Sequence, residues 1–111
     1  MAAQALERQG YRILERNFRC PLGEINLIGR DGAVLVFVEV KTRRSPDFDP
    51  SWAMTLRKQK HLVRTAQWYL KGLRRSAEPY CRFDAVFVSG SMEAPHDAKV
   101  TVQKGVFQSE R

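Results

Sequence analysis

The sequence has few of the residues from which metal sites and disulfide frameworks are usually built. It contains two cysteines, Cys20 and Cys81, and two histidines, His61 and His96. None of them has the CxxC or Cys/His spacing of a zinc site. In a chain without an export signal, two thiols are expected to be reduced and partly buried. These shortages argue against a zinc-binding or disulfide-stabilised protein and give the cysteines no catalytic role.

Long hydrophobic runs are also absent. The longest apolar run, residues 33–38, is ended by Glu39, whereas a membrane-spanning helix needs about 20 apolar residues. The first ten residues have no basic leader followed by an apolar core, so they do not resemble a secretory signal. We therefore expect a cytoplasmic protein with no membrane partner.

What the chain does have is a globular composition and an excess of positive charge. Hydrophobic residues make up 43% and charged residues 28% of the 111 positions, which suits one packed core, so we expect a single domain over residues 1–111. The formal net charge is +7. A basic surface attracts polyanions and releases their counterions. Nucleic acid is therefore the favoured partner, although many small basic proteins bind none, and a homodimer stays open.

Hydrophobic spacing and turn residues divide the chain into a helix, three strands, a long helix and two further strands. The elements are expected over residues 2–9, 11–17, 23–30, 33–42, 55–73, 81–90 and 99–107. The long helix between the third and fourth strands must cross over the sheet. We therefore predict an α/β fold in which helices flank a central, mixed, five-stranded sheet.

An Asp-Gly pair at residues 31–32 is the strongest hairpin signal in the chain, and it should pair two strands that carry polar side chains. Glu24 and Asn26 alternate with apolar residues and so share a face of the first strand. Glu39 and Lys41 share a face of the second, which is otherwise apolar, and charged residues there need a partner or a metal. Two acids, an amide and an ammonium group can then converge on one patch.

Such a patch suits metal-assisted phosphodiester hydrolysis. Carboxylate oxygens hold Mg²⁺, the metal polarises the phosphate, and a lysine stabilises the developing charge. The same residues also suit a partly solvated salt bridge between Lys41 and Glu39 or Glu24, because ion pairs gather near strand ends. Residue types and spacing do not choose between the two interpretations.

A wider resemblance favours metal-assisted hydrolysis over the salt bridge. The segment GEINLIGRDGAVLVFVEVKTRRS resembles the hairpin of the YraN-like family of uncharacterised, endonuclease-like proteins, and the likeness runs from ALERQGYRILERN through TLRKQKHLVRTAQWYL to CRFDAVFV. Its E-V-K step is similar to the second half of the PD-(D/E)xK motif of nucleases and archaeal Holliday-junction resolvases. The resemblance implies a restriction-endonuclease-like fold, bound Mg²⁺ or Mn²⁺, and structured DNA, including branched DNA, as substrate. It further implies a catalytic set of Glu39, Lys41, Asn26 and Glu24, with Glu39, Asn26 and Glu24 as metal ligands.

Two features depart from the family pattern. Where the family usually reads G-E-I-D-L-I, this chain has Asn26, and a neutral amide should bind Mg²⁺ more weakly than a carboxylate. The family's acidic residue in a G-E-x-x-A segment of the first helix would precede the first residue of this sequence, and a truncated start or a lost acid would give the same sequence. A DNA-binding module without hydrolysis is therefore an alternative, and so is a protein-interaction domain with a structural Glu39–Lys41 pair.

Basic residues outside the motif are candidates for phosphate contacts, which position a protein on nucleic acid without reading sequence. We expect such contacts from Arg43, Arg44, Lys58, Lys60 and Arg64. A solvated loop and an ordinary basic helix surface would explain the same residues.

The aromatic and acidic residues nearby are assigned structural roles. Trp52 and Trp68 could stack on bases, but Trp68 lies close to the apolar side of its helix and is expected in the core. Asp84 is expected to be the partner of an arginine.

Overall fold

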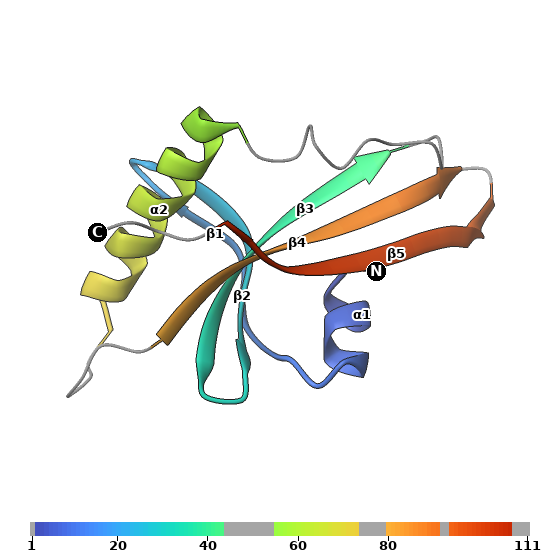
Figure 1. Cartoon of the computed structure of the whole chain (residues 1–111), viewed down its shortest axis with the longest axis horizontal. Coiled ribbons are helices and arrows are strands. Elements are labelled where there is room, and N and C mark those ends of the chain that lie inside the picture. Colours follow the sequence, from blue (N-terminus) through green and yellow to red (C-terminus); the bar gives the residue numbers. More distant parts are fainter. Residues whose placement is uncertain (1, 44–54, 74–79, 92–93, 108–111) are drawn as a thin grey trace.

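The computed structural model describes residues 2–43, 55–73, 80–91 and 94–107. The described chain contains a five-stranded mixed sheet and two helices in the predicted order (Figure 1). The elements are α1 (Ala2–Arg8), β1 (Arg12–Cys20), β2 (Gly23–Asp31), β3 (Val34–Arg43), α2 (Leu56–Lys71), β4 (Tyr80–Ser91) and β5 (Ala94–Phe107). The predicted α/β fold class is confirmed, and β1, β4 and β5 are longer than predicted.

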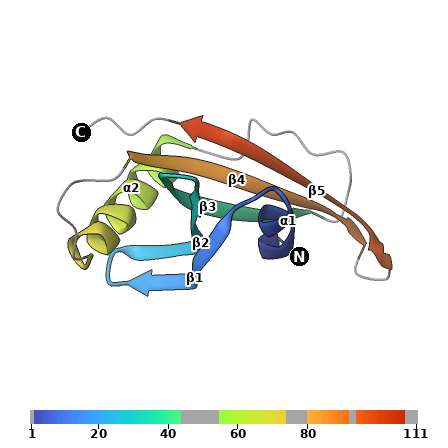
Figure 2. The same ribbon diagram turned by 90° about the horizontal axis from the view of Figure 1, so that it is seen from below.

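The strands follow one another across the sheet in the order β1-β2-β3-β4-β5. Neighbouring strands are antiparallel except for β3 and β4, which are parallel. The parallel pair is a consequence of α2, since a crossover helix returns the chain to the end from which the previous strand began. Figure 2 shows β1 and β5 at the two edges of the sheet.

The hairpin between β2 and β3 turns one residue later than predicted. Asp31 is paired with Val34, so that Gly32 and Ala33 form the turn. Gly32 has a φ of 62°, a left-handed conformation that glycine adopts without steric cost. Asp31 stays in the strand, where Arg82 and Lys104 bind its carboxylate. A one-residue change of register alters which side chains lie opposite each other.

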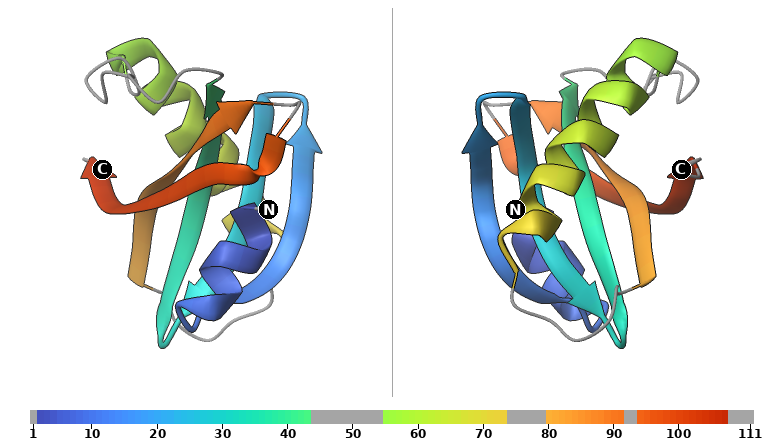
Figure 3. Two further views of the ribbon diagram at one scale, coloured as in Figure 1. Left: turned by 90° about the vertical axis from the view of Figure 1, so that its right-hand side faces the viewer. Right: turned by 90° about the vertical axis from the view of Figure 1, so that its left-hand side faces the viewer.

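Two apolar clusters cover the two faces of the sheet. On one face, Val36 of β3 packs with Leu6 of α1. On the other, Phe37 packs beneath Leu62 and Ala66 of α2. Figure 3 shows α1 in front of the sheet from one side and α2 in front of it from the opposite side. Because side chains alternate along a strand, β3 is buried on both faces, which explains its apolar sequence.

The pairing of β2 with β3 extends from the turn as far as Leu27 and Val38. Beyond that point β2 continues beside β1, and β3 continues beside β4. Asn26 bridges the two strands where their backbone pairing ends, because its side-chain Oδ1 accepts a hydrogen bond of 2.8 Å from the Val40 backbone N–H. The sheet therefore forks immediately before Glu39 and Lys41.

Helix α2 begins where Thr55 caps it by accepting a hydrogen bond from the Lys58 backbone N–H. It buries Leu62, Thr65 and Ala66 against the sheet. Trp68, however, is 47% exposed, so its predicted place in the core is wrong. The reason is geometric, because two residues beyond Ala66 turn the side chain by about 200° around the helix.

Two remaining expectations concern the membrane and the cysteines. Neither helix in the described ranges is long and apolar enough to cross a membrane. Cys20 and Cys81 form no disulfide; Cys20 is half-buried as expected, whereas Cys81 is exposed.

Candidate functional site

Glu39 is the centre of a charged group between β3 and α2, which we call the Glu39 cluster and which comprises Glu39, Lys41 and Lys58. The Nζ atom of Lys58 lies 2.7 Å from Oε1 of Glu39, and the Nζ atom of Lys41 lies 3.4 Å from the same oxygen. The Glu39 side chain is 11% exposed, while those of Lys41 and Lys58 are 26% and 32% exposed. Glu39 is thus covered by two cations that solvent still reaches.

Local structure explains why these three groups meet. Glu39 and Lys41 follow Phe37 at alternate positions of β3 and so share its face, the one covered by α2. Lys58 lies one helical turn before the buried Leu62 and therefore points toward the sheet. The sequence predicted Lys58 only as a DNA contact, although a lysine on the apolar side of a helix is itself a signal of a buried partner.

The two lysines do not share Glu39 equally. The pKa of Lys41 is lowered, first by the neighbouring Lys58 and then by burial, which together outweigh Glu39. For Lys58, burial acts to lower the pKa, but the hydrogen bond to Glu39 leads the contributions that raise it overall. Lys58, at 2.7 Å, is therefore the closer partner of Glu39, and Lys41, at 3.4 Å, is the more distant one.

The structure places the other predicted catalytic residues as follows. Asn26 lies beside the cluster, since its side chain binds the backbone between Glu39 and Lys41. Glu24 instead forms an exposed ion pair of 2.9 Å with Arg19 of the edge strand β1. The site thus joins Glu39 and Lys41, brings Asn26 to their backbone, and leaves Glu24 engaged elsewhere.

A divalent cation would find one carboxylate in the Glu39 cluster. Within the described ranges, no three or more His, Cys, Asp or Glu side chains lie together as a possible metal site. Asn26 retains acceptor capacity, because a carbonyl oxygen has two lone pairs and the Val40 N–H uses one. Mg²⁺ is commonly held by one or two carboxylates together with substrate phosphates. One carboxylate and one amide oxygen are too few donors for a permanently bound cation, so a cation here would need a phosphate to complete its ligands.

The remaining basic candidates lie at different places. Lys60 and Arg64 are exposed on α2. Arg43 is the last residue of β3. Arg44 and Trp52 lie outside the described residues.

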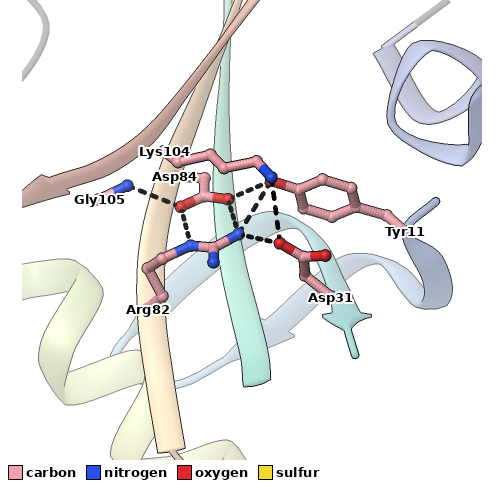
Figure 4. Close-up of polar contacts among 6 residues, drawn as sticks. All are labelled: Tyr11, Asp31, Arg82, Asp84, Lys104 and Gly105. Carbon is pink, nitrogen blue, oxygen red and sulfur yellow. Dashed lines mark hydrogen bonds and ion pairs between the residues drawn. The ribbon is translucent and has the colours of Figure 1, made fainter. Parts of the chain in front are cut away.

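A second polar group lies on the α1 side of the sheet (Figure 4), and we call it the Asp84 network. The Asp84 carboxylate accepts hydrogen bonds from the Tyr11 hydroxyl (2.6 Å), from Nε and Nη2 of Arg82 (2.8 and 2.9 Å) and from the Gly105 backbone N–H (2.9 Å). Arg82 Nη2 and Lys104 Nζ also bind Asp31, at 2.8 and 3.3 Å. The prediction that Asp84 pairs with an arginine is confirmed.

The Asp84 network is suited to holding strands together and not to binding a ligand. The Asp84 side chain is 0% exposed, and its donors fill the roughly four acceptor sites of a carboxylate. Burial and the hydrogen bond to Asp84 raise the pKa of Tyr11, so its hydroxyl keeps its proton. The network ties the start of β1 and the hairpin to β4 and β5.

Comparison with known proteins places the sequence in a family. The model of the uncharacterised protein family UPF0102 matches residues 1–88. A UPF0102 protein of Symbiobacterium thermophilum is 53% identical over 88 residues, covering 78% of this chain and 74% of the relative. Relatives from Caldicellulosiruptor saccharolyticus (49% over 88 residues, 78% and 74%) and Moorella thermoacetica (47% over 107 residues, 96% and 88%) carry the same description.

Proposed function

The chain belongs to UPF0102, an uncharacterised protein family, as its YraN-like sequence indicated, and from that premise we propose that it is a nuclease-like protein that binds the phosphodiester backbone of DNA at the Glu39 cluster. One observation carries the proposal. Two lysines from separate elements, β3 and α2, converge on one oxygen of one carboxylate. In the Asp84 network, by contrast, the two cations Arg82 and Lys104 meet two carboxylates, so that the Glu39 cluster alone of these two groups has one cation more than it has anions.

The charges of the cluster favour an anion. Its three groups sum to a formal charge of +1, and both ammonium groups are partly exposed. A phosphate oxygen can accept a charge-assisted hydrogen bond from Lys41, whose hold on Glu39 is the looser at 3.4 Å. Lys58 then keeps Glu39 neutralised while Lys41 binds the phosphate.

The proposal includes a divalent cation, Mg²⁺ or Mn²⁺, with Glu39 and Asn26 as its protein ligands. It would supply Lewis-acid polarisation of the phosphate and an activated water. The free cation is repelled by the ammonium groups of Lys41 and Lys58, whereas a bound phosphate adds negative charge. Metal and DNA should therefore strengthen each other's binding, as linkage requires. Glu24 can join only when its exposed and hence weak ion pair with Arg19 opens.

The substrate class rests on two kinds of support. The net charge of +7 favours a polyanion. The similarity of the E-V-K step to resolvases favours structured DNA, with branched DNA as the first substrate to test. DNA binding without hydrolysis is the second candidate, favoured by the neutral Asn26 amide and its bond to Val40.

The test compares Lys41→Ala with Lys104→Ala, which removes an exposed lysine from the Asp84 network instead. Binding to a fluorescent four-way junction and to a duplex is measured by anisotropy over a salt series. A plot of log K against log salt has a negative slope, and loss of one phosphate contact should make that slope shallower by about one. We expect this change in Lys41→Ala alone. Equal slopes in both variants would refute the proposed site.

Gel analysis of the same junction with Mg²⁺ or Mn²⁺ separates the two candidates. Cleavage by the wild type that is lost in Glu39→Gln supports the nuclease. Junction binding without cleavage supports the module that binds and does not hydrolyse.

A further inference from the structure

The side of α2 that faces away from the sheet carries a row of basic residues. We call it the basic stripe; its members, all exposed, are Arg57, Lys60, Arg64 and Lys71. At about 100° per residue they fall within roughly 60° of one another, opposite Leu62 and Ala66, and the row is about 21 Å long. Helix α2 contains no acidic residue. The stripe is therefore a surface of one sign and not a solvated face of mixed charge.

Trp68 stands beside this stripe. It is 47% exposed, and it lies four residues after Arg64 and three before Lys71, which makes both its neighbours on the helix surface. A large aromatic surface held among cations suits a ligand that is both anionic and flat, because the ring can stack while the cations bind charge.

We propose that the basic stripe and Trp68 bind a single-stranded segment of nucleic acid, in which Trp68 stacks on an unpaired base and the stripe contacts the flanking phosphates. The inference rests on the proposed function, since it takes DNA as the partner. It adds a second contact surface to the Glu39 cluster. The two surfaces meet at the first turn of α2, where Lys58 faces the sheet and Arg57 faces away. Paired and unpaired parts of one structured DNA could thus be bound together.

A lipid surface is the competing partner for a basic helix face with a tryptophan. Helices that bind membranes insert a broad apolar face into the interface. The apolar side of α2 is already packed on the sheet. Beside the stripe this leaves two separate large apolar side chains, Trp68 and the 74%-exposed Leu56 at the first residue of the helix, which do not make a broad apolar face. The charge and the single aromatic ring therefore favour nucleic acid.

The experiment reads Trp68 directly by fluorescence. The full-length wild type and Trp68→Phe are titrated with oligothymidine, with a duplex of equal length, with inorganic polyphosphate, and with phosphatidylglycerol–phosphatidylcholine vesicles. Because phenylalanine is silent at tryptophan excitation, the difference between the two proteins isolates Trp68 from Trp52. We expect saturable quenching of Trp68 by oligothymidine, weaker quenching by duplex, and none by polyphosphate, which has charge but no bases.

Affinity provides a second readout. Trp68→Ala should weaken oligothymidine binding roughly 5- to 150-fold, the usual contribution of one base stacked on an aromatic ring, while Trp68→Phe should retain most of the affinity. Equal quenching by polyphosphate, or a response to vesicles alone, would overturn the inference. Duplex or junction binding that depends on Lys41 with no change at Trp68 would overturn this inference but leave the proposed function standing. Absence of any DNA binding would overturn both.

Discussion

Replacing Arg82 with methionine should destabilise the fold strongly, because it leaves the Asp84 carboxylate buried without its cation. Asp84 would lose hydrogen bonds of 2.8 and 2.9 Å and keep those from Tyr11 and Gly105. Breaking one side of a buried ion pair costs about 3–5 kcal/mol. Arg82 itself is 25% exposed, which places the cost near the lower end, at about 3 kcal/mol. Methionine keeps most of the side-chain volume, so the cost reports charge and hydrogen bonding.

This cost is large against the roughly 5–15 kcal/mol that stabilises a typical domain. It would be measured by urea unfolding followed by circular dichroism. The matched control is Lys104→Met, which removes a 50%-exposed lysine from the same network and should cost less than about 1 kcal/mol. A second variant, Arg82→Met with Asp84→Ala, should recover part of the loss. If Arg82→Met and Lys104→Met lowered the free energy of unfolding by similar amounts, this account of the network would be refuted.

Two further predictions concern the Glu39 cluster. DNA affinity should fall as pH rises through the lowered pKa of Lys41, before ordinary lysines titrate near about 10.4, because the protonated form of Lys41 binds phosphate. Lys41→Arg should move this loss of affinity to higher pH. An identical pH profile of DNA affinity in the variant would contradict the assignment. Asn26→Asp should strengthen Mn²⁺ binding by about 2 kcal/mol, or roughly thirtyfold, since a unit and a double charge about 4 Å apart attract by that amount even in water. Calorimetric titration with and without DNA tests the second, with Gln103→Glu on β5 as the control for added charge.

The order of elements could be predicted because it depends on local signals. The Asp-Gly pair marked the hairpin, and the alternation and crossover rules then gave a mixed sheet. The turn was placed one residue early because the sequence does not show that Asp31 binds Arg82, a residue 51 positions away. An arginine partner for Asp84 was predicted, but its hydrogen bond from Tyr11 was out of reach for the same reason, since that bond spans 73 positions.

The candidate site was predicted in part. Glu39 and Lys41 share a face of one strand, and the structure brings them together. Asn26 lies beside them, but its side chain binds the backbone, because β2 and β3 separate there and the Val40 N–H needs an acceptor. Trp68 was misplaced because its neighbours Tyr69 and Leu70 are apolar, and nearness in sequence was mistaken for nearness on the helix surface.

The Glu39 cluster and the Asp84 network lie on opposite sides of the same central strands, separated by the apolar residues of β3 and β4. One side can therefore be altered while the other keeps the strands fastened. This insulation should let side chains around Glu39 be exchanged without loss of the fold.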